Sequence, residues 1–125
     1  MALKVNMAEK TPGVFHLCPA GSIDTLTAPI LEGEVNRVLA ASPRAVVFEM
    51  EGVDYISSMG VRVIFKTRKE LARRGARFAM AGVTPPVQRV FDIINALPRE
   101  EIFRSAKELD DYLAAMQKQA REDGE

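Results

Sequence analysis

The run DYISSMGVRVI, residues 54–64, joins an apolar, strand-like segment to an amphipathic, helix-like segment. Its serines, Ser57 and Ser58, therefore fall on the turn that opens a helix. The first backbone N–H groups of a helix have no partner within the helix, and the aligned peptide dipoles favour negative charge there. A serine at this point either caps the helix or offers its hydroxyl to a partner, a phosphate or a substrate.

Composition restricts the class of protein. The 125 residues correspond to one domain, and 17 Lys and Arg balance 17 Asp and Glu, so no charge excess indicates nucleic acid or an anionic membrane surface. Cys18 is the single cysteine, which excludes an intramolecular disulfide and fits a reducing compartment, and no histidine cluster indicates a metal site. No apolar run approaches the roughly 20 residues of a membrane span, and residues 1–10 lack a signal-peptide core. We therefore expect a cytoplasmic protein without direct membrane insertion.

The chain before the central run alternates between strand and helix patterns. Apolar residues alternate in its first segments, then recur at helical spacing, then form a short run with adjacent β-branched residues that is typical of a central strand covered on both faces. We expect strands at 2–7 and 14–21 joined by a turn at 9–13, a helix at 29–41 with Thr27 as its cap, and the central strand at 44–50.

The chain after this point continues the alternation. We expect one domain over 1–117 and a polar tail over 118–125. The patterns predict a crossing turn at 54–57, a helix at 58–74 stopped by Gly75, a strand at 77–83, a helix from Pro85 or Pro86 to Pro98, a short strand at 102–103, and a last helix with a capping box at Ser105 and Glu108.

This order of elements predicts an α/β fold. We expect a mostly parallel sheet of four to five strands, with an N-terminal hairpin-like strand pair, right-handed crossovers and helices packed against the sheet. Strand ends that face helix openings are the usual place for function in such sheets. Asp24, on the turn after the second strand, should therefore lie near Ser58.

Catalysis and nucleotide binding lack the residues they need. A nucleophile elbow requires a glycine two residues before the nucleophile, but Ile56 stands there relative to Ser58. His16, the one histidine, lies in an apolar strand, where a structural role is the simpler interpretation. The sequence contains neither a Walker loop nor a dinucleotide fingerprint, so we expect no enzyme activity and no cofactor.

The basic residues of the 58–74 helix do not indicate nucleic acid. Glu70 interrupts them, and no aromatic side chains are interleaved with them, so we interpret them as a solvated helix face. These basic residues are Arg62, Lys66, Arg68, Lys69, Arg73 and Arg74.

The serine pair supports two interpretations that the residues alone leave open. A phosphate on Ser58 would add about −1.5 to −2 charges, which the helix dipole favours and which Asp24, Asp54 and an acidic or closely packed partner would oppose. That combination suits a switchable protein interface. In the alternative, Ser57 or Ser58 caps the helix and Asp24 stabilises its own turn.

Two motifs make the sequence similar to a known family. Residues 21–24 (GSID), followed by Thr27 and Ala28, resemble the turn before the first helix of the STAS domain, and residues 54–64 resemble its phosphorylation loop and second helix. STAS domains occur in anti-sigma factor antagonists and in the cytoplasmic tails of sulfate transporters. The resemblance extends from about Leu3 to Met116.

The resemblance implies a partner-switching protein. Ser58 corresponds to the phosphoacceptor, Asp24 to the aspartate that contacts the kinase, and the partners would be an anti-sigma factor serine kinase of the histidine-kinase-like ATPase fold and a metal-dependent serine phosphatase. Two positions depart from the family pattern: Ser57 stands where many members have aspartate, and Met59 replaces a small residue.

Our sequence-based hypothesis is a phospho-switchable binding module that binds its kinase when unphosphorylated. The alternative is a constitutive STAS scaffold subunit of a membrane-lipid transport or signalling complex that is not phosphorylated, and a serine hydrolase ranks third. The predicted partner-binding residues are Asp24, Thr25, Asp54, Ser57, Ser58, Met59, Gly60 and Arg62.

Overall fold

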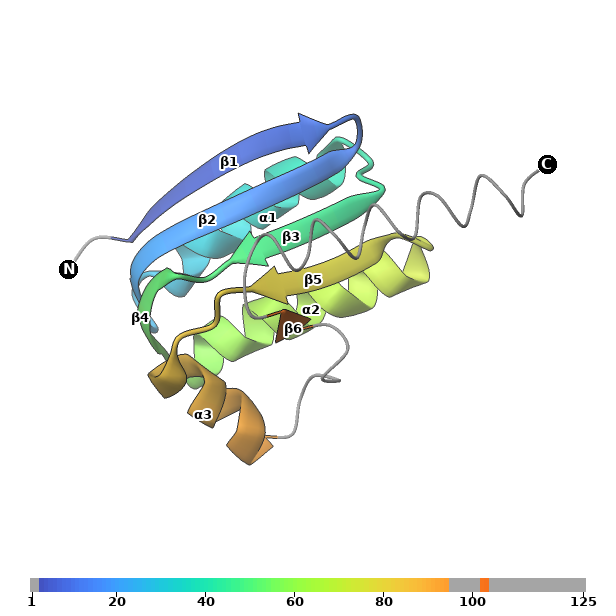
Figure 1. Cartoon of the computed structure of the whole chain (residues 1–125). Helices are drawn as coiled ribbons and strands as arrows, with labels where there is room; N and C mark the ends of the chain where they lie inside the picture. The colour runs from blue at the N-terminus through green and yellow to red at the C-terminus, as the bar shows by residue number, and fades with distance from the viewer. Residues whose placement is uncertain (1–2, 95–101, 104–125) are drawn as a thin grey trace.

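A computed structural model describes residues 3–94 and 102–103 of the chain. Within this part, helices pack against a six-stranded sheet (Figure 1). The elements in chain order are β1 (Lys4–Thr11), β2 (Val14–Ile23), α1 (Ala28–Ala40), β3 (Ala45–Glu49), β4 (Gly52–Ile56), α2 (Ser58–Arg73), β5 (Arg77–Ala81), α3 (Pro85–Ile94) and β6 (Ile102–Phe103).

The sheet is mostly parallel. Its strand order is β1-β2-β3-β5-β6, with β4 paired to β2 beyond the end of β3. Only β1 and β2 pair antiparallel among the described strands, and every other described pair is parallel. Helices α1 and α2 lie side by side on one face of the sheet (Figure 1). The predicted α/β class with an N-terminal hairpin is therefore confirmed.

Strand β4 corrects the sequence analysis. Residues 54–56, expected as part of a crossing turn, belong to this strand, which adds one strand to the sheet. Val53 and Ile56 are buried, whereas the consecutive residues Asp54 and Tyr55 are both exposed. The register with β2 shifts here, with Val53 opposite Gly21 and Tyr55 opposite Ser22, so Asp54 is an extra residue that interrupts the alternation of the strand. Because a bulge interrupts the alternation and Asp54 is polar, this segment has the sequence pattern of a turn although it forms a strand.

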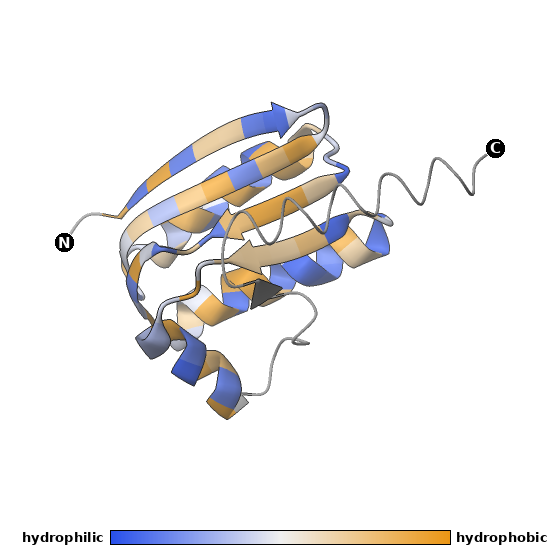
Figure 2. Ribbon diagram, viewed as in Figure 1, coloured by the Kyte–Doolittle hydropathy of each residue, from blue (hydrophilic) through white to orange (hydrophobic). Residues whose placement is uncertain are grey.

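The hairpin is also longer than expected. β1 continues to Thr11, so the predicted turn at 9–13 is wrong over its first part, and the chain reverses at Pro12 and Gly13. Hydrophobic and hydrophilic residues alternate along the edge strand β1, as Figure 2 shows, and its residues are exposed except for the half-buried Val5. Gly13 has a φ of +81°, a backbone conformation that is strained for a residue with a side chain.

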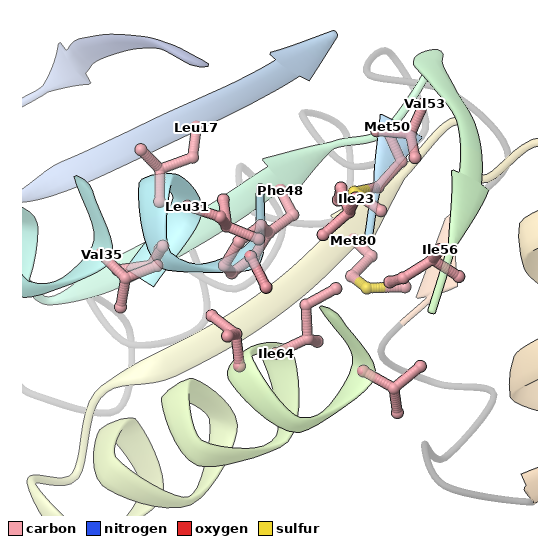
Figure 3. Close-up of a cluster of buried hydrophobic side chains, with 14 of the residues drawn as sticks. Leu17, Ile23, Leu31, Val35, Phe48, Met50, Val53, Ile56, Ile64 and Met80 are labelled. Atoms are coloured by element: carbon pink, nitrogen blue, oxygen red, sulfur yellow. The ribbon is translucent and has the colours of Figure 1, made fainter. Parts of the chain in front are cut away.

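The core lies between the sheet and the helices α1 and α2 (Figure 3). β3 is buried on both of its faces, as predicted for the central strand: Val46 and Phe48 belong to this core, and Ala45 and Val47 belong to a second buried cluster. The side chains labelled in Figure 3 are Leu17, Ile23, Leu31, Val35, Phe48, Met50, Val53, Ile56, Ile64 and Met80.

The chain after α3 is described only at β6, where the predicted short strand pairs parallel with β5. The expected closure of the third helix at Pro98, the last helix with its capping box at Ser105 and Glu108, and the polar tail over 118–125 lie outside the described residues. In the part of the chain that the structure describes, no helix has the length and the apolar character needed to cross a membrane.

Substitution of Gly60, in the first turn of α2, tests how closely this helix packs against β2 and β4. A methyl group on its Cα would lie 2.6 Å from Ile23 Cγ2 and 2.7 Å from Ile56 Cγ1. Because both isoleucines are buried, Gly60→Ala should destabilise the protein by about 1–3 kcal/mol in urea unfolding. Gly33→Ala in α1 is the matched control, since nothing lies within 4 Å of its added carbon. Gly33→Ala should raise the free energy of unfolding by roughly 0.5–1 kcal/mol, because alanine favours the helix more than glycine does. Equal stability of the two variants would contradict the close packing around Gly60.

Candidate functional site

The pairing of β2 with β4 brings two segments together that are distant in sequence. Ile23 pairs with Ile56, the Ser57 N–H donates to the Ile23 carbonyl at 2.7 Å, and Ser22 Oγ donates to Asp54 Oδ1 at 2.8 Å. The turn that follows β2 and the start of α2 therefore lie on the same edge of the sheet. The sequence pattern predicts that the end of the second strand lies beside the end of the central strand at 44–50, but in the structure it is β4 that pairs with the end of β2.

The turn between β2 and α1 is organised by Asp24. Its Oδ1 accepts hydrogen bonds from the backbone N–H groups of Thr27 and Leu26, both at 2.9 Å. These bonds, with that of Thr27 the strongest influence, hold the pKa of the Asp24 carboxyl below its usual range. The prediction that Asp24 stabilises its own turn is confirmed.

Thr27 occupies the N-cap position of α1, but its side chain does not cap the helix. The hydroxyl instead donates to the Ser22 carbonyl at 2.7 Å and accepts from the Asp24 N–H at 2.8 Å. The predicted cap is wrong in this respect, because the hydroxyl is already used within the preceding turn. The turn is thereby fixed from both sides, by the threonine hydroxyl and by the aspartate carboxylate.

The two serines have different environments. Ser57 is the N-cap of α2, with φ −92° and ψ 173°, and its Oγ accepts from the Gly60 N–H at 3.4 Å. Ser58 is the first residue of the helix and is exposed, and its hydroxyl makes no hydrogen bond with any described residue. The capping role therefore belongs to Ser57, and the Ser58 hydroxyl is available to solvent.

The remaining predicted contact residues divide into two groups. Thr25, Asp54, Met59 and Arg62 are exposed and lie on the elements around Ser58. Gly60 is buried: its Cα faces the core, so it lets α2 approach β2 and β4 and does not itself present a surface to a partner.

Exposed apolar side chains border the same site. Leu26 in the turn is 86% exposed and Tyr55 on β4 is 53% exposed. Ile30 in the first turn of α1 and Met59 in that of α2 are exposed to 47% and 38%. All four lie on the turn after β2, on β4 or in the first turn of a helix that follows one of them, and exposed apolar surface beside a candidate site favours protein binding. Leu26, Ile30 and Tyr55 are not among the contact residues predicted from the sequence, although each falls outside the apolar spacing of its element, which indicates exposure.

A second polar cluster lies within the sheet. The Glu49 carboxylate accepts from Cys18 Sγ at 3.3 Å, lies 3.0 Å from Nδ1 of the buried His16, and lies 3.6 Å from Lys10 Nζ. Burial raises the pKa of Glu49, but the hydrogen bonds from Cys18 and His16 outweigh it, so the pKa is lowered. His16 thus has the structural role that the sequence suggested.

Cys18 is held as a neutral thiol by this cluster. Burial, reinforced by the hydrogen bond to Glu49, raises its pKa from 9.0 to about 11. A nucleophilic cysteine needs a lowered pKa, so this environment disfavours thiolate chemistry. Within residues 3–94 and 102–103, no group of three His, Cys, Asp or Glu side chains is arranged to hold a metal ion.

Comparisons with known proteins agree on one family. Residues 6–109 match the STAS domain family. BtrV of Bordetella bronchiseptica, classed as an anti-sigma factor antagonist, is 31% identical over 91 residues, which cover 73% of this chain and 78% of BtrV.

Solved structures show the same fold. An anti-sigma factor antagonist from Mycobacterium paratuberculosis superposes with a TM-score of 0.75 at 25% identity, over 93% of this chain and 95% of that chain. The Bacillus cell fate determinant SpoIIAA, in its phosphorylated form, superposes with a TM-score of 0.72 over 88% of this chain and 99% of SpoIIAA. At 13% identity, the likeness to SpoIIAA concerns the fold alone.

The division between the serines predicts different effects on stability. Ser57→Ala removes the cap of α2 and should lower the free energy of unfolding by about 0.5–1 kcal/mol, at the low end for caps because the bond is long. Ser58→Ala is the matched control and should stay within about 0.5 kcal/mol of the wild type. Urea unfolding measures both, and a larger loss for Ser58→Ala would reverse the assignment of the cap.

The raised pKa of Cys18 predicts slow alkylation. Because the fold favours the neutral thiol, its stabilisation is present below the unfolded pKa and is lost as pH rises toward about 11. At pH 8 the native thiolate fraction should be on the order of 100-fold below that of the urea-unfolded chain, and iodoacetamide should react correspondingly slowly. Glu49→Gln removes the neighbouring charge and should accelerate the native reaction. Equal native and unfolded rates would contradict the assigned environment.

Proposed function

The chain belongs to the STAS domain family, and we propose that it is an anti-sigma factor antagonist that binds a serine-kinase anti-sigma factor and is released when Ser58 is phosphorylated. The proposed kinase has the histidine-kinase-like ATPase fold, and a metal-dependent serine phosphatase restores the binding form. BtrV and the Mycobacterium paratuberculosis protein, both named as anti-sigma factor antagonists, support the general role.

The observation that carries the proposal is the exposed, unbonded hydroxyl of Ser58 beside a serine that is already used. Ser57 Oγ accepts from the Gly60 N–H, and a phosphate there would disturb the cap of α2. Ser58 has no such bond to lose. A kinase can therefore reach and modify Ser58 without first breaking an interaction of the folded protein.

A phosphate on Ser58 would change the charge of the binding surface more than its fold. It adds about −1.5 to −2 charges at the N-terminus of α2, where the helix dipole and the free N–H groups favour an anion. The carboxylates of Asp24 and Asp54 lie on the same edge and oppose it. The modified protein therefore remains folded while its surface becomes more acidic.

Because apolar residues surround Ser58, the charge that a phosphate adds would strongly weaken the binding of a partner. Tyr55 and Met59 are exposed on either side of Ser58 in the sequence, and Leu26 lies in the adjoining turn. A partner that buries these side chains would also have to remove water from the phosphate, which costs several kcal/mol without a matching cation. Asp24, Thr25 and Arg62 add polar contacts around this apolar centre, as is usual for protein interfaces.

A constitutive scaffold in a membrane-lipid transport or signalling complex is the second candidate. The observation that favours it is Met59, whose exposed side chain adjoins Ser58 and crowds a kinase that must reach the hydroxyl. The same apolar surface would then serve a permanent partner, with no phosphate involved.

Phosphorylation distinguishes the two candidates. The protein incubated with ATP and its candidate kinase should gain one phosphate by intact mass, Ser58→Ala should gain none, and the matched variant Ser57→Ala should still be modified. Ser58→Asp should weaken binding to the kinase by roughly 30-fold or more, since a buried unpaired charge costs about 2 kcal/mol or more. An unmodified wild type whose binding is equally insensitive to Ser58→Ala and Ser58→Asp would favour the scaffold.

A further inference from the structure

A cleft of about 610 Å³ lies between α1 and α2, away from the turn that carries Ser58. Its apolar lining includes Val35 and Leu39 of α1 and Val63 of α2. Val35 and Val63 are buried, and Leu39 is partly buried. The neighbouring Thr67 hydroxyl donates to the Val63 carbonyl at 2.8 Å, so it presents no free polar group to the cleft. The floor is suited to an alkyl chain.

Two polar contacts cross from one helix to the other at this cleft. Lys66 Nζ lies 3.2 Å from Glu32 Oε2, and Arg74 Nη1 donates to the Leu39 carbonyl at 2.7 Å. On α1, Glu32 and Leu39 are separated by roughly 10 Å at 1.5 Å per residue, with Val35 between them. The apolar floor therefore has a polar contact near each end of the segment 32–39 of α1.

The rim of the cleft carries an excess of positive charge. Its ionisable lining consists of four cations and two acids, a net charge of about +2 from the difference. Glu32 is paired with Lys66, and Glu70 is paired with Arg73 and Arg74. Lys69 makes no ion pair with any residue of the described part, so its ammonium is available to a ligand.

We propose that this cleft binds a fatty-acid carboxylate, with the alkyl chain on Val35, Leu39 and Val63 and the head group at Lys69. The volume falls in the range of about 300–1,000 Å³ that is usual for small-molecule sites, and an apolar floor with a few polar groups is their usual lining. The positive charge of the rim favours a ligand with an anionic head group. A neutral apolar ligand would leave that charge without a partner. This site is distinct from the proposed phosphorylation surface at the other end of α2.

Titration of the full chain with decanoate, followed by backbone amide NMR shifts, tests the proposal. Saturable shifts should centre on Val35, Leu39 and Val63. Decanol, which has the same chain without the charge, should bind about fivefold more weakly, and acetate, which has the head group without the chain, should give no saturable shifts in the cleft. Absence of saturation with decanoate, or equal affinity for decanol, would overturn the proposal.

Charge reversal at Lys69 gives a second, independent readout. Lys69→Glu should weaken decanoate binding about fivefold or more, because it places a carboxylate where the head group lies. Lys4→Glu on the exposed strand β1 is the matched control and should bind like the wild type. Unchanged affinity in Lys69→Glu would refute the assigned head-group position. No kinase takes part in this measurement, so its failure would leave the proposed phosphorylation switch unaffected.

Discussion

The parallel pairing of β2 with β4 is the constraint on which the site depends. Ile23 and Ile56 pair across it, and both side chains would meet any carbon added to Gly60. The pairing therefore fixes three things together: the end of β2, the end of β4 and the approach of α2 to both. Because the Ser57 N–H donates to the Ile23 carbonyl, the first turn of α2 begins at a position set by the sheet. A site built on paired strand ends is held more rigidly than one built on loops.

This constraint also explains why two adjacent serines differ. Once the backbone of Ser57 is bonded to β2, its extended conformation directs the Oγ toward the open N–H of Gly60, and the side chain becomes a cap. Ser58 is then the first helical residue, and its exposed hydroxyl makes no hydrogen bond with a described residue. Structural and proposed signalling roles are thereby separated by one residue, and a change at the second serine leaves the first undisturbed.

Much of the fold could be predicted because burial leaves a pattern in the sequence: a helical period in residues 58–74, and a continuous apolar run in β3, which is buried on both faces. β4 could not be predicted in this way, because its exposed positions Asp54 and Tyr55 hide the strand pattern. The same limit applies to function. The family motif identified Ser58 and Asp24, but the exposure of Leu26 depends on the conformation of the turn before α1, which the hydrogen bonds of Asp24 and Thr27 fix only in the folded chain.

Helix α2 carries both proposed anion-binding features, and its electrostatics explain how they coexist. Its first turn offers unpaired N–H groups and the positive end of the dipole, so a covalent phosphate on Ser58 needs no cationic side chain to be tolerated. Its last turns have the opposite polarity, and Arg73 and Arg74 near that end offset it while also binding Glu70. An anionic ligand at the C-terminal half therefore requires a cation beyond those already paired. Lys69, unpaired within the described residues, supplies that charge, so affinity for an anion there depends on a side chain, whereas at Ser58 it depends on the backbone.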